Sequence, residues 1–436
     1  MLRDLIFSKK FCESHKKRKE YFTRERIFNF SGLMLFQMNI ASKSLTVELT
    51  RFFKRISGNT QEKNGSKQSY SDARMKMSYQ AYVELNDRFV SAYYADDDYQ
   101  RWKGYRLIAI DGSRIQLPST PAMIEEFGIA ENKGKSIPMA MTSPAYDVLN
   151  HLVINTYLAR YEASERALAE QHVERIKELT PKSKDILLLD RGYPSLYLCT
   201  KMLVNGYNFV IRCNAENFLN EVKEFAKSAT TDQIIEIDVT KSTRKHSPEL
   251  QALLRNHSLA TIRLRIVKIV LSSGVTEYLL TSLLDQQQIS DDDLKNIYHL
   301  RWNEETYFNF QKNVLEIENF SGKTPEAIRQ DYYARVLSTN VNSLLIQEAQ
   351  QEVDRETQQS EHRQYENYGI NKTVATGILK DEVIEMLFAP REHWKQRYQS
   401  LVASIKRYII PKIPGRSFAR KEKIPNKSFL KRRKAI

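Results

Sequence analysis

The feature that most constrains the fold is a pair of short apolar segments, each ending in an aspartate with a glycine close behind it. Leu107–Ile110 precede Asp111, and Ile186–Leu189 precede Asp190. Such short apolar runs are typical of buried strands, and a glycine lets the chain turn sharply after them. Each aspartate is therefore expected at a strand end, either as a turn former or as a rigidly held carboxylate beside open space.

A polar stripe on a later helix is the second unusual feature. Tyr298, Arg301, Glu305 and Lys312 are spaced so that, on one helix, they fall within an arc of roughly 60°. A core-facing stripe would be apolar. The stripe is therefore either a surface ladder of charges, with Arg301 facing Glu305, or part of a site. Glu304 competes for the carboxylate role, but it lies about 100° from Glu305 around the helix.

Together these segments resemble the bacterial insertion-sequence-four (IS-four) family of DDE transposases. The family's helix motif is a tyrosine, an arginine, a glutamate and a lysine at the spacing found from Tyr298 to Lys312. Ala109–Ser113 resembles the family's first aspartate motif, and Leu189–Tyr193 resembles its second. The resemblance covers roughly residues 105 to 345. It implies an enzyme that binds the terminal inverted repeats of a mobile element, cleaves DNA and joins the 3′ ends to target DNA.

The resemblance implies that Asp111, Asp190 and Glu305 are the catalytic residues and the metal ligands. Phosphodiester cleavage needs the attacking and leaving oxygens in line, and two divalent ions about 4 Å apart can activate the one and stabilise the other. Mg²⁺ takes hard oxygen ligands such as these carboxylates, and Mn²⁺ is the expected substitute. We therefore expect two ions per site. Without a cation, the three carboxylates would raise one another's pKa.

Cations and aromatic side chains around these carboxylates are expected to contact DNA. Cations would repel metal ions but attract phosphates, so we expect backbone contacts near the scissile bond from Tyr298, Arg301, Lys312 and Arg191. Trp302 and Tyr307 have two interpretations, because aromatic rings either pack in a core or stack on an unpaired base.

Charge is consistent with a nucleic-acid partner. The chain carries 67 Lys and Arg against 53 Asp and Glu, for a net charge of +14. A basic balance favours a polyanion such as double-stranded DNA. The excess is concentrated in Lys16–Lys19 and in residues 412–436, which either contact the DNA backbone or form solvated tails.

The remaining sequence signals indicate a cytoplasmic protein. No run of about 18 or more apolar residues is present, so neither a spanning helix nor a membrane partner is expected. The first residues lack a signal-peptide pattern. Cys12, Cys199 and Cys213 form no metal or disulfide spacing, as expected in a reducing compartment. We expect a protein of the bacterial cytoplasm, associated with the nucleoid and homodimeric on DNA.

The order of elements predicts an α/β fold. Strands are expected at 106–110, 113–117, within 147–161, at 186–189 and at 208–212, with helices at 164–179 and 194–204. The first two strands are expected to form a hairpin that turns at Asp111. Three strands, then alternating helices and strands, is the order of a ribonuclease-H-like fold, a mixed five-stranded sheet flanked by helices.

Three regions are expected along the chain. Residues 1–100 form a helical, basic region that either binds DNA or supports the catalytic domain, with Ser71 capping a helix that reaches Leu85. Residues 101–345 form the catalytic domain. Its segment of about 216–284 alternates as strands do, with a basic loop at Lys241–His246, and such a β-rich insertion before the catalytic helix is a feature of the resembled family. Residues 346–436 form a helical C-terminal region with a basic tail.

Overall fold

The computed structural model describes residues 1–24, 26–39, 44–56, 65–132, 135–215, 218–238, 247–271, 274–359 and 365–413. The chain divides into two compact units, each with its own core. Unit 1 comprises Met1–Phe89, Leu117–Met123 and Phe310–Ile436, and unit 2 comprises Val90–Gln116 and Ile124–Asn309. Within the described part of the chain, no helix has the length and apolar character needed to cross a membrane.

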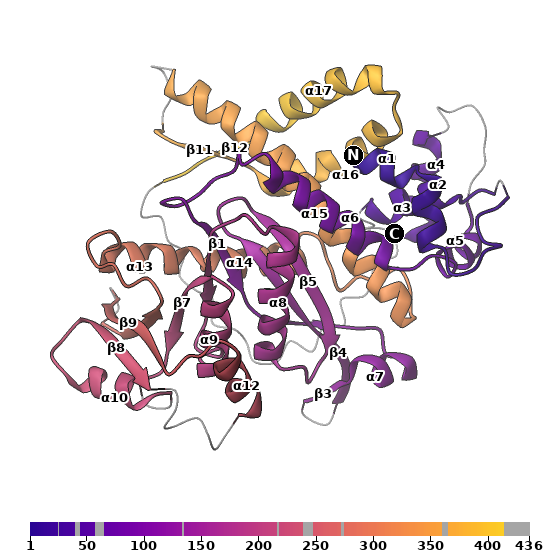
Figure 1. Ribbon diagram of the computed structural model, residues 1–436. Coiled ribbons are helices and arrows are strands. Elements are labelled where there is room, and N and C mark those ends of the chain that lie inside the picture. The colour runs from indigo at the N-terminus through magenta and orange to yellow at the C-terminus, as the bar shows by residue number, and fades with distance from the viewer. Residues whose placement is uncertain are drawn as a thin grey trace. The chain divides into compact units, whose positions relative to one another are not determined.

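Unit 2 is a mixed α/β unit built on one large sheet (Figure 1). Its strands are β1 (Arg106–Ile110), β2 (Ser113–Gln116), β3 (Ile129–Asn132), β4 (Lys135–Asp147), β5 (Leu152–Arg160), β6 (Asp185–Leu189), β7 (Asn208–Cys213), β8 (Asp232–Asp238), β9 (Thr261–Val270) and β10 (Thr276–Thr281). Its helices are α8 (Glu165–Leu179), α9 (Leu196–Val204), α10 (Asn220–Lys227), α12 (Pro248–Asn256) and α13 (Asp291–Leu300). Helices α7 (Pro121–Phe127) and α14 (Trp302–Asn313) each cross a unit boundary.

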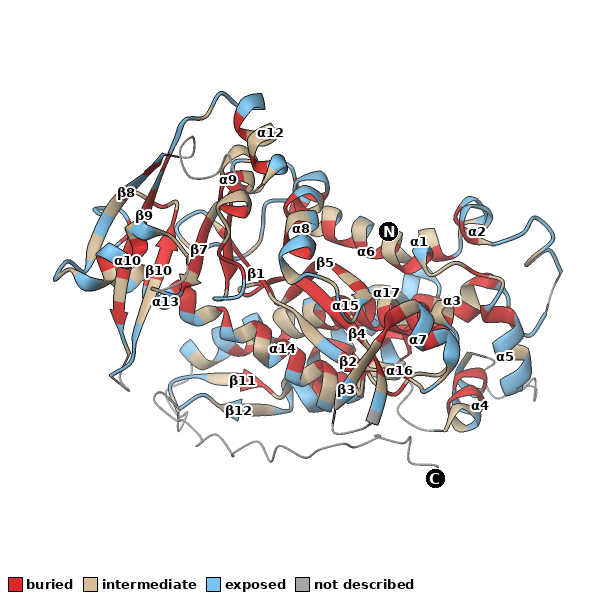
Figure 2. Cartoon of the chain, turned by 90° about the horizontal axis from the view of Figure 1, so that it is seen from below, coloured by how far each residue is buried: buried red, intermediate tan, exposed pale blue. Residues whose placement is uncertain are grey.

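The centre of this sheet is parallel and fully buried. The sheet order is β2-β4-β1-β6-β7-β10-β9-β8, and β3 and β5 also pair with β4. β1 is parallel to β6, and β6 is parallel to β7, whereas β4 is antiparallel to β1. All residues of β1 are buried (Figure 2), and so are all residues of β6, as expected for apolar strands covered on both faces. Helix α8 packs on β4 and β5, and α9 packs on β7.

Strands β1 and β2 do not form the predicted hairpin. Ile110 pairs with Ala145 and Ser113 pairs with Thr142, so both short strands run along β4 in the same register. β1 and β2 are therefore two parts of one extended strand that is interrupted at Asp111–Gly112. The prediction was wrong because a glycine permits a break as well as a turn, and because the long partner strand is distant in sequence.

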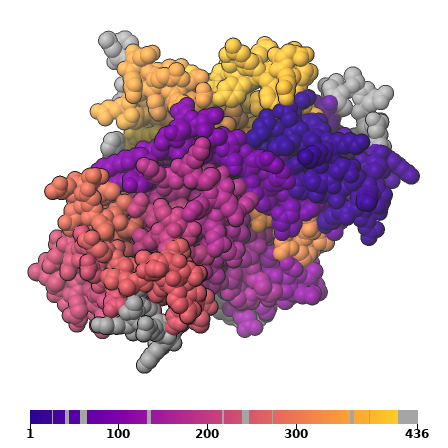
Figure 3. Space-filling model, in the orientation of Figure 1, coloured from indigo at the N-terminus to yellow at the C-terminus, as the bar shows by residue number. Residues whose placement is uncertain are grey.

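Strands β8, β9 and β10 lie in the segment of about 216–284 that was predicted to be β-rich, and they extend the main sheet. β10 pairs antiparallel with β7 on one side and with β9 on the other, and β9 pairs with β8. The expected five-stranded sheet is thereby a ten-stranded one. In the space-filling view the segment with β8 to β10 packs directly on the neighbouring part of the same unit (Figure 3). The predicted basic loop Lys241–His246 lies outside the described residues.

Unit 1 is mainly helical. Its elements are α1 (Leu2–Ile6), α2 (Lys9–His15), α3 (Phe30–Met38), α4 (Leu45–Ile56), α5 (Lys67–Arg74), most of α6 (Gln80–Ala95), α15 (Pro325–Gln358), β11 (Tyr368–Ile370), α16 (Lys372–Phe388), α17 (Trp394–Lys406) and β12 (Ile409–Pro411). The predicted helix from Ser71 to Leu85 is wrong. Ser66 caps α5 instead, because its hydroxyl accepts a hydrogen bond from the Ser69 amide at 3.0 Å. Almost all of the predicted basic tail lies outside the described residues.

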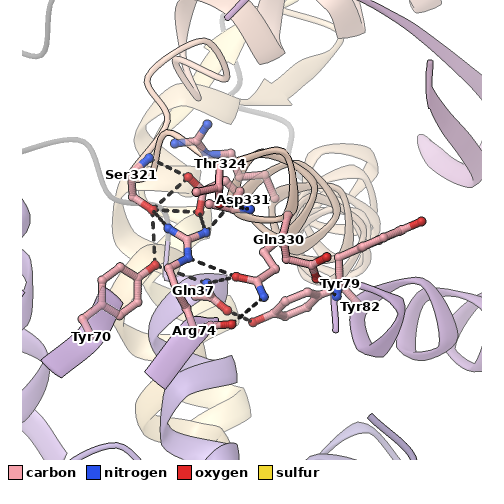
Figure 4. Close-up of polar contacts among 12 residues, drawn as sticks. Gln37, Tyr70, Arg74, Tyr79, Tyr82, Ser321, Thr324, Gln330 and Asp331 are labelled. Atoms are coloured by element: carbon pink, nitrogen blue, oxygen red, sulfur yellow. Dashed lines mark hydrogen bonds and ion pairs between the residues drawn. The ribbon is translucent and has the colours of Figure 1, made fainter. Parts of the chain in front are cut away.

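A buried polar network within unit 1 joins α5 to α15 (Figure 4). Arg74 is only 2% exposed. Its Nε donates to Gln330 Oε1 at 3.0 Å, its Nη1 donates to Ser321 Oγ at 2.7 Å, and its Nη2 donates to Asp331 Oδ1 at 2.8 Å. Every nitrogen of this guanidinium therefore has an acceptor, as buried charges require.

Candidate active site

The two strand-end aspartates lie side by side in unit 2. Ile110 of β1 pairs with Leu189 of β6 in parallel register, so Asp111 and Asp190 follow directly from neighbouring positions. Each carboxylate accepts a hydrogen bond from the backbone amide of the next residue. The amide of Gly112 donates to Asp111 Oδ1 at 2.8 Å, and the amide of the exposed Arg191 donates to Asp190 Oδ1 at 2.7 Å. These contacts fix both side chains at the carboxyl ends of β1 and β6.

Arg301 brings the three predicted carboxylates together. Its Nη1 lies 3.6 Å from Asp111 Oδ2, and its Nη2 lies 3.8 Å from Asp190 Oδ2 and 3.4 Å from Glu305 Oε1. The arginine is 1% exposed, whereas the three carboxylates retain contact with solvent. The predicted i,i+4 contact between Arg301 and Glu305 is thus present, as one side of a cluster that also contains both aspartates.

The electrostatic surroundings separate the two aspartates. Burial raises the pKa of Asp111 to about 6, and the neighbouring charges of Asp190 and Glu165 add to this shift. Burial also acts to raise the pKa of Asp190, but the Arg191 amide and the guanidinium groups of Arg301 and Arg212 outweigh it and hold the pKa below its usual value. Such opposite shifts in neighbouring carboxylates are typical of functional sites.

The predicted continuous helix from Tyr298 to Lys312 is interrupted at Arg301. Helix α13 ends at Leu300 and α14 begins at Trp302. The Arg301 amide bonds to the carbonyl of Tyr298 at 3.1 Å, a tighter spacing than in an α-helix. Single tight turns within helices often mark functional positions. The break does not separate the stripe, because the Tyr298 hydroxyl donates to Asp190 Oδ1 at 3.2 Å.

Glu304, the alternative to Glu305 as third carboxylate, contacts the backbone of Asp111. It is fully buried, and its Oε1 accepts a hydrogen bond from the Asp111 amide at 3.1 Å. Its Oε2 has no hydrogen-bond partner among the described residues. Burial, together with the charge of Asp111, raises the Glu304 pKa well above its ordinary value. Glu304 and Glu305 therefore both belong to the site, one inside it and one at its rim.

The remaining predicted residues are placed differently. Tyr307 is buried and stacks on Tyr146 with ring centroids 4.7 Å apart, which fits the core interpretation. Trp302 is 43% exposed and therefore accessible to a ligand. Lys312 lies on α14 beyond the boundary of unit 2.

Sequence reasoning missed Arg212, which lies on β7 beside the second aspartate. Its Nε donates to Asp190 Oδ1 at 2.8 Å, and its Nη1 contacts Glu277 on β10. The parallel pairing of β6 with β7 creates this contact, since Leu189 lies opposite Ile211. Aligning the two predicted strands in parallel could have revealed it. Tyr193 was also missed, although its hydroxyl is buried and has no hydrogen-bond partner within the described residues.

The donor set suits a divalent cation chemically, since carboxylate oxygens are the ligands that Mg²⁺ and Mn²⁺ prefer. As the side chains stand, no three acidic, histidine or cysteine groups of the described residues lie close enough to share an ion. The guanidinium of Arg301 is the positive charge that the three carboxylates share. Nitrogens Nε and Nη1 of this arginine have no hydrogen-bond partner among the residues described.

Comparisons with known proteins match the segment that carries the candidate site. A family model described as "Transposase DDE domain" matches residues 102–341, more than half of the 436 residues. The chain is 22% identical over 275 residues to the Escherichia coli K12 transposase InsG of insertion sequence element IS4, which covers 62% of this chain and 58% of InsG. It is 28% identical over 125 residues to a second protein of that strain, InsZ, covering 28% of this chain and 39% of InsZ.

A piggyBac transposase, solved in a synaptic complex with hairpin DNA, aligns with 97% of this chain and 87% of its own, at 11% identity and a TM-score of 0.48. The chain spans 58% of InsG and a smaller share of InsZ. The match to an IS4 transposase confirms the IS-four resemblance. The match of the family model over residues 102–341 shows that the chain belongs to the DDE transposase family.

Proposed function

We propose that this chain is a transposase that binds the terminal inverted repeats of an insertion sequence, cleaves DNA at those ends and joins the 3′ ends to target DNA. The observation that carries the proposal is the cluster around Arg301. Asp111, Asp190 and Glu305 come from three separate elements and lie within 3.8 Å of one guanidinium. This cluster belongs to the segment that the transposase model matches.

The sheet supports a ribonuclease-H-like arrangement in unit 2. Its strands β5, β4, β1, β6 and β7 are adjacent in that order, with β4 antiparallel to the three that follow. We propose that Asp111 follows the first strand of that fold, Asp190 its fourth strand, and that Glu305 comes from a later helix. Strands β8 to β10 form the insertion before that helix.

We propose that Asp111, Asp190 and Glu305 hold two divalent ions, Mg²⁺ or in its place Mn²⁺. When bound, such ions activate a water and stabilise the leaving oxygen. The protein's own groups orient the carboxylates: Tyr298 and Arg212 donate to Asp190, and Glu304 accepts from the Asp111 amide. Nε and Nη1 of Arg301, which have no hydrogen-bond partner among the described residues, suit phosphate oxygens, because a guanidinium presents its donors as a planar fork.

DNA contacts would extend beyond this centre. Double-stranded DNA is the proposed partner, with Arg191 and Lys312 on its backbone and Trp302 stacked on a base. We further propose that the basic N-terminal region (residues 1–100) takes part in binding the ends. The catalytic domain would comprise residues 101–345, and the C-terminal region residues 346–436. The active species would be a homodimer on DNA, in the bacterial cytoplasm at the nucleoid.

The test is single-turnover cleavage by the full chain. The substrate is a duplex carrying the element's end, and an unrelated duplex of equal length is the control, both with Mg²⁺. We expect Asp111→Asn, Asp190→Asn and Glu305→Gln each to slow cleavage by about a thousandfold or more, since several kcal/mol of charge stabilisation depend on them. Binding of the duplex should change by less than about twofold, because these groups act on the transition state.

The alternatives give different outcomes. A metal-dependent nuclease of the same fold would cut but would never join the 3′ end to a second duplex. A non-catalytic DNA-binding descendant would bind without cutting in either Mg²⁺ or Mn²⁺. If Glu304→Gln abolished cleavage and Glu305→Gln did not, the third carboxylate would be Glu304.

A further inference from the structure

The start of helix α8 brings another carboxylate to the two aspartate loops. Ser164 caps this helix, since its hydroxyl accepts from the Ala167 amide at 3.4 Å, and Glu165 is the first helical residue. A Cβ atom added to Gly112 would lie 2.7 Å from Glu165 Oε1, and one added to Gly192 would lie 3.6 Å from Oε2. One carboxylate therefore approaches the backbone of both loops, at the glycine of each.

The neighbouring residue fixes this position. Arg166 donates from Nε to the carbonyl of Gly192 at 2.9 Å. The first turn of α8 is thereby tied to the loop that carries Asp190. A Cβ at residue 112 would lie 2.7–2.9 Å from side-chain atoms of Glu165, so a side chain there would displace the Glu165 carboxylate. Gly112 thus leaves room for a carboxylate, whereas a Cβ at Gly192 would be in ordinary van der Waals contact with that carboxylate.

A buried hydroxyl provides independent evidence of a ligand here. Tyr193 is 1% exposed, and its hydroxyl has no hydrogen-bond partner among the described residues. Burial raises its pKa well above the ordinary value, and so do the charges of four surrounding carboxylates: Asp111, Glu165, Glu304 and Asp190. A buried polar atom in a native protein is normally satisfied. This hydroxyl therefore points to an additional group among the carboxylates, such as a hydrated cation.

We propose that Glu165 is a fourth carboxylate ligand of the active centre and shares a divalent cation with Asp111. The inference rests on the proposed function. Two divalent ions carry four positive charges, whereas Asp111, Asp190 and Glu305 supply three negative ones. Glu165 supplies the fourth. In the absence of metal the same four carboxylates repel one another, and the guanidinium groups of Arg301 and Arg212 offset part of their charge.

The test measures Mn²⁺ binding to the full chain without DNA, by titration calorimetry and by the electron paramagnetic resonance of free Mn²⁺. Glu165→Gln keeps the size of the side chain and removes its charge. Since even outer-shell partners of metal ligands change affinity by about tenfold or more, we expect the Mn²⁺ dissociation constant to rise at least about tenfold. Glu165→Asp should give an intermediate value.

Glu162→Gln is the matched control. Glu162 precedes the same helix, and its carboxylate lies over Gly128, with Oε1 2.5 Å from a Cβ added there, rather than over the aspartate loops. This variant should bind Mn²⁺ like the unmodified chain.

Thermal unfolding distinguishes a metal-ligand role of Glu165 from a purely structural role. As a ligand, Glu165→Gln should keep or raise the Tm of the metal-free protein, because repulsion is relieved, and should shrink the rise that Mn²⁺ produces. A lowered metal-free Tm with unchanged Mn²⁺ affinity would overturn the inference. The inference would also be overturned if Glu165→Gln changed neither the Mn²⁺ affinity nor the Tm while Asp111→Asn weakened Mn²⁺ binding in the same assay. If Asp111→Asn also left Mn²⁺ binding unchanged, the proposed function itself would fail.

Discussion

Two buried arginines, one in each unit, have opposite surroundings. Arg74 in unit 1 and Arg301 in unit 2 are almost equally inaccessible, at 2% and 1% exposure. Each nitrogen of Arg74 donates to an acceptor at 2.7–3.0 Å. Arg301 has carboxylates at 3.4–3.8 Å, and its Nε and Nη1 have no hydrogen-bond partner within the described residues.

The difference indicates that Arg74 stabilises the fold, whereas Arg301 is kept in place by the fold without all of its hydrogen bonds being satisfied. A fully satisfied buried network fixes one arrangement of its members. A partly satisfied network costs free energy, and such costs persist in proteins mainly at functional sites. The carboxylates around Arg301 also have 23–37% of their side-chain surface exposed, whereas Asp331 beside Arg74 has 6%. Water can therefore reach one cluster and not the other.

The largest expected effect tests this contrast directly. Arg74→Met should lower the free energy of unfolding by about 3–5 kcal/mol, because Asp331 would remain buried without its cation. Arg301→Met should change it by less than about 1 kcal/mol, since its partner carboxylates stay hydrated. Urea unfolding of the two variants measures both values. Equal losses would remove the distinction between the two clusters.

The second prediction concerns the cleavage rate, for which Arg301 should matter although it contributes little to the free energy of unfolding. Arg301→Met should reduce single-turnover cleavage by about a hundredfold or more, as loss of a preorganised charge in an active site does. The dissociation constant for the DNA end should change much less, because the contact strengthens in the transition state. The control is Arg263→Met, which removes a 57%-exposed arginine paired with Glu236 on the same sheet. Parallel losses of binding and cleavage would make Arg301 a simple DNA-affinity residue.

A third buried cluster, around His172, lies in the same unit as Arg301 but has its hydrogen bonds made. It tests whether hydrogen bonding or the unit decides how a buried group contributes to stability. His172 in unit 2 is fully buried and contacts Asn155 and the Ser143 carbonyl. Burial lowers its pKa to about 3, so the folded chain holds the neutral imidazole. The unfolded chain binds a proton below about pH 6.5, and the stabilisation present above that pH is lost as pH falls toward the folded pKa.

The measurement for this cluster is the free energy of unfolding between about pH 4 and 7, compared with His172→Gln. Relative to that variant, the unmodified chain should lose up to about 1.4 kcal/mol per pH unit below about pH 6.5. Identical slopes would mean that His172 is protonated in the folded state, and its cluster would then resemble that of Arg301.

The smallest effect concerns cations that belong to neither cluster. The tail residues Lys427, Lys431, Arg432, Arg433 and Lys434 lie outside the described residues. Replacing them with glutamine should weaken binding to any DNA and lower the salt slope by about 0.9 per lost phosphate contact. We expect cleavage of the saturated complex to stay within about twofold, because affinity that the tail adds equally to ground state and transition state does not change the rate of the bound complex. Lost cleavage with an unchanged salt slope would indicate that the tail acts through folding or assembly.

Local patterns predicted part of the site, and pairing between distant segments created the rest. Asp111 and Asp190 could be predicted because each follows its own apolar strand. Glu305 was predicted from the resemblance to the family's helix motif, because its spacing to Arg301 alone also fits a surface ion pair. Arg212 could not be placed without the β6–β7 pairing, nor Glu165 without knowing that the first turn of α8 lies at both aspartate loops.

The same limit explains the errors in the predicted fold. The hairpin at Asp111 was wrong because β4, the strand that pairs with both of its halves, begins 24 positions later, at Lys135. The continuous catalytic helix was wrong because the sequence carries no proline or glycine between Tyr298 and Lys312 to signal the tight turn at Arg301. Strands β1, β2, β6 and β7 were recognisable from the local sequence, whereas β3 and β4 were not predicted, and the pairing and interruption of the elements depend on the folded unit.

The shared register of β1 and β2 along β4 has a consequence for chain length. Residues 111 and 112 bridge two segments that are already paired with one uninterrupted strand. One residue inserted or deleted there would shift β2 by one position and turn its side chains to the opposite face of the sheet. The length of the loop that carries Asp111 is therefore fixed by the strand beside it. Functional variation in this region should arise by exchange of residues and not by insertions or deletions.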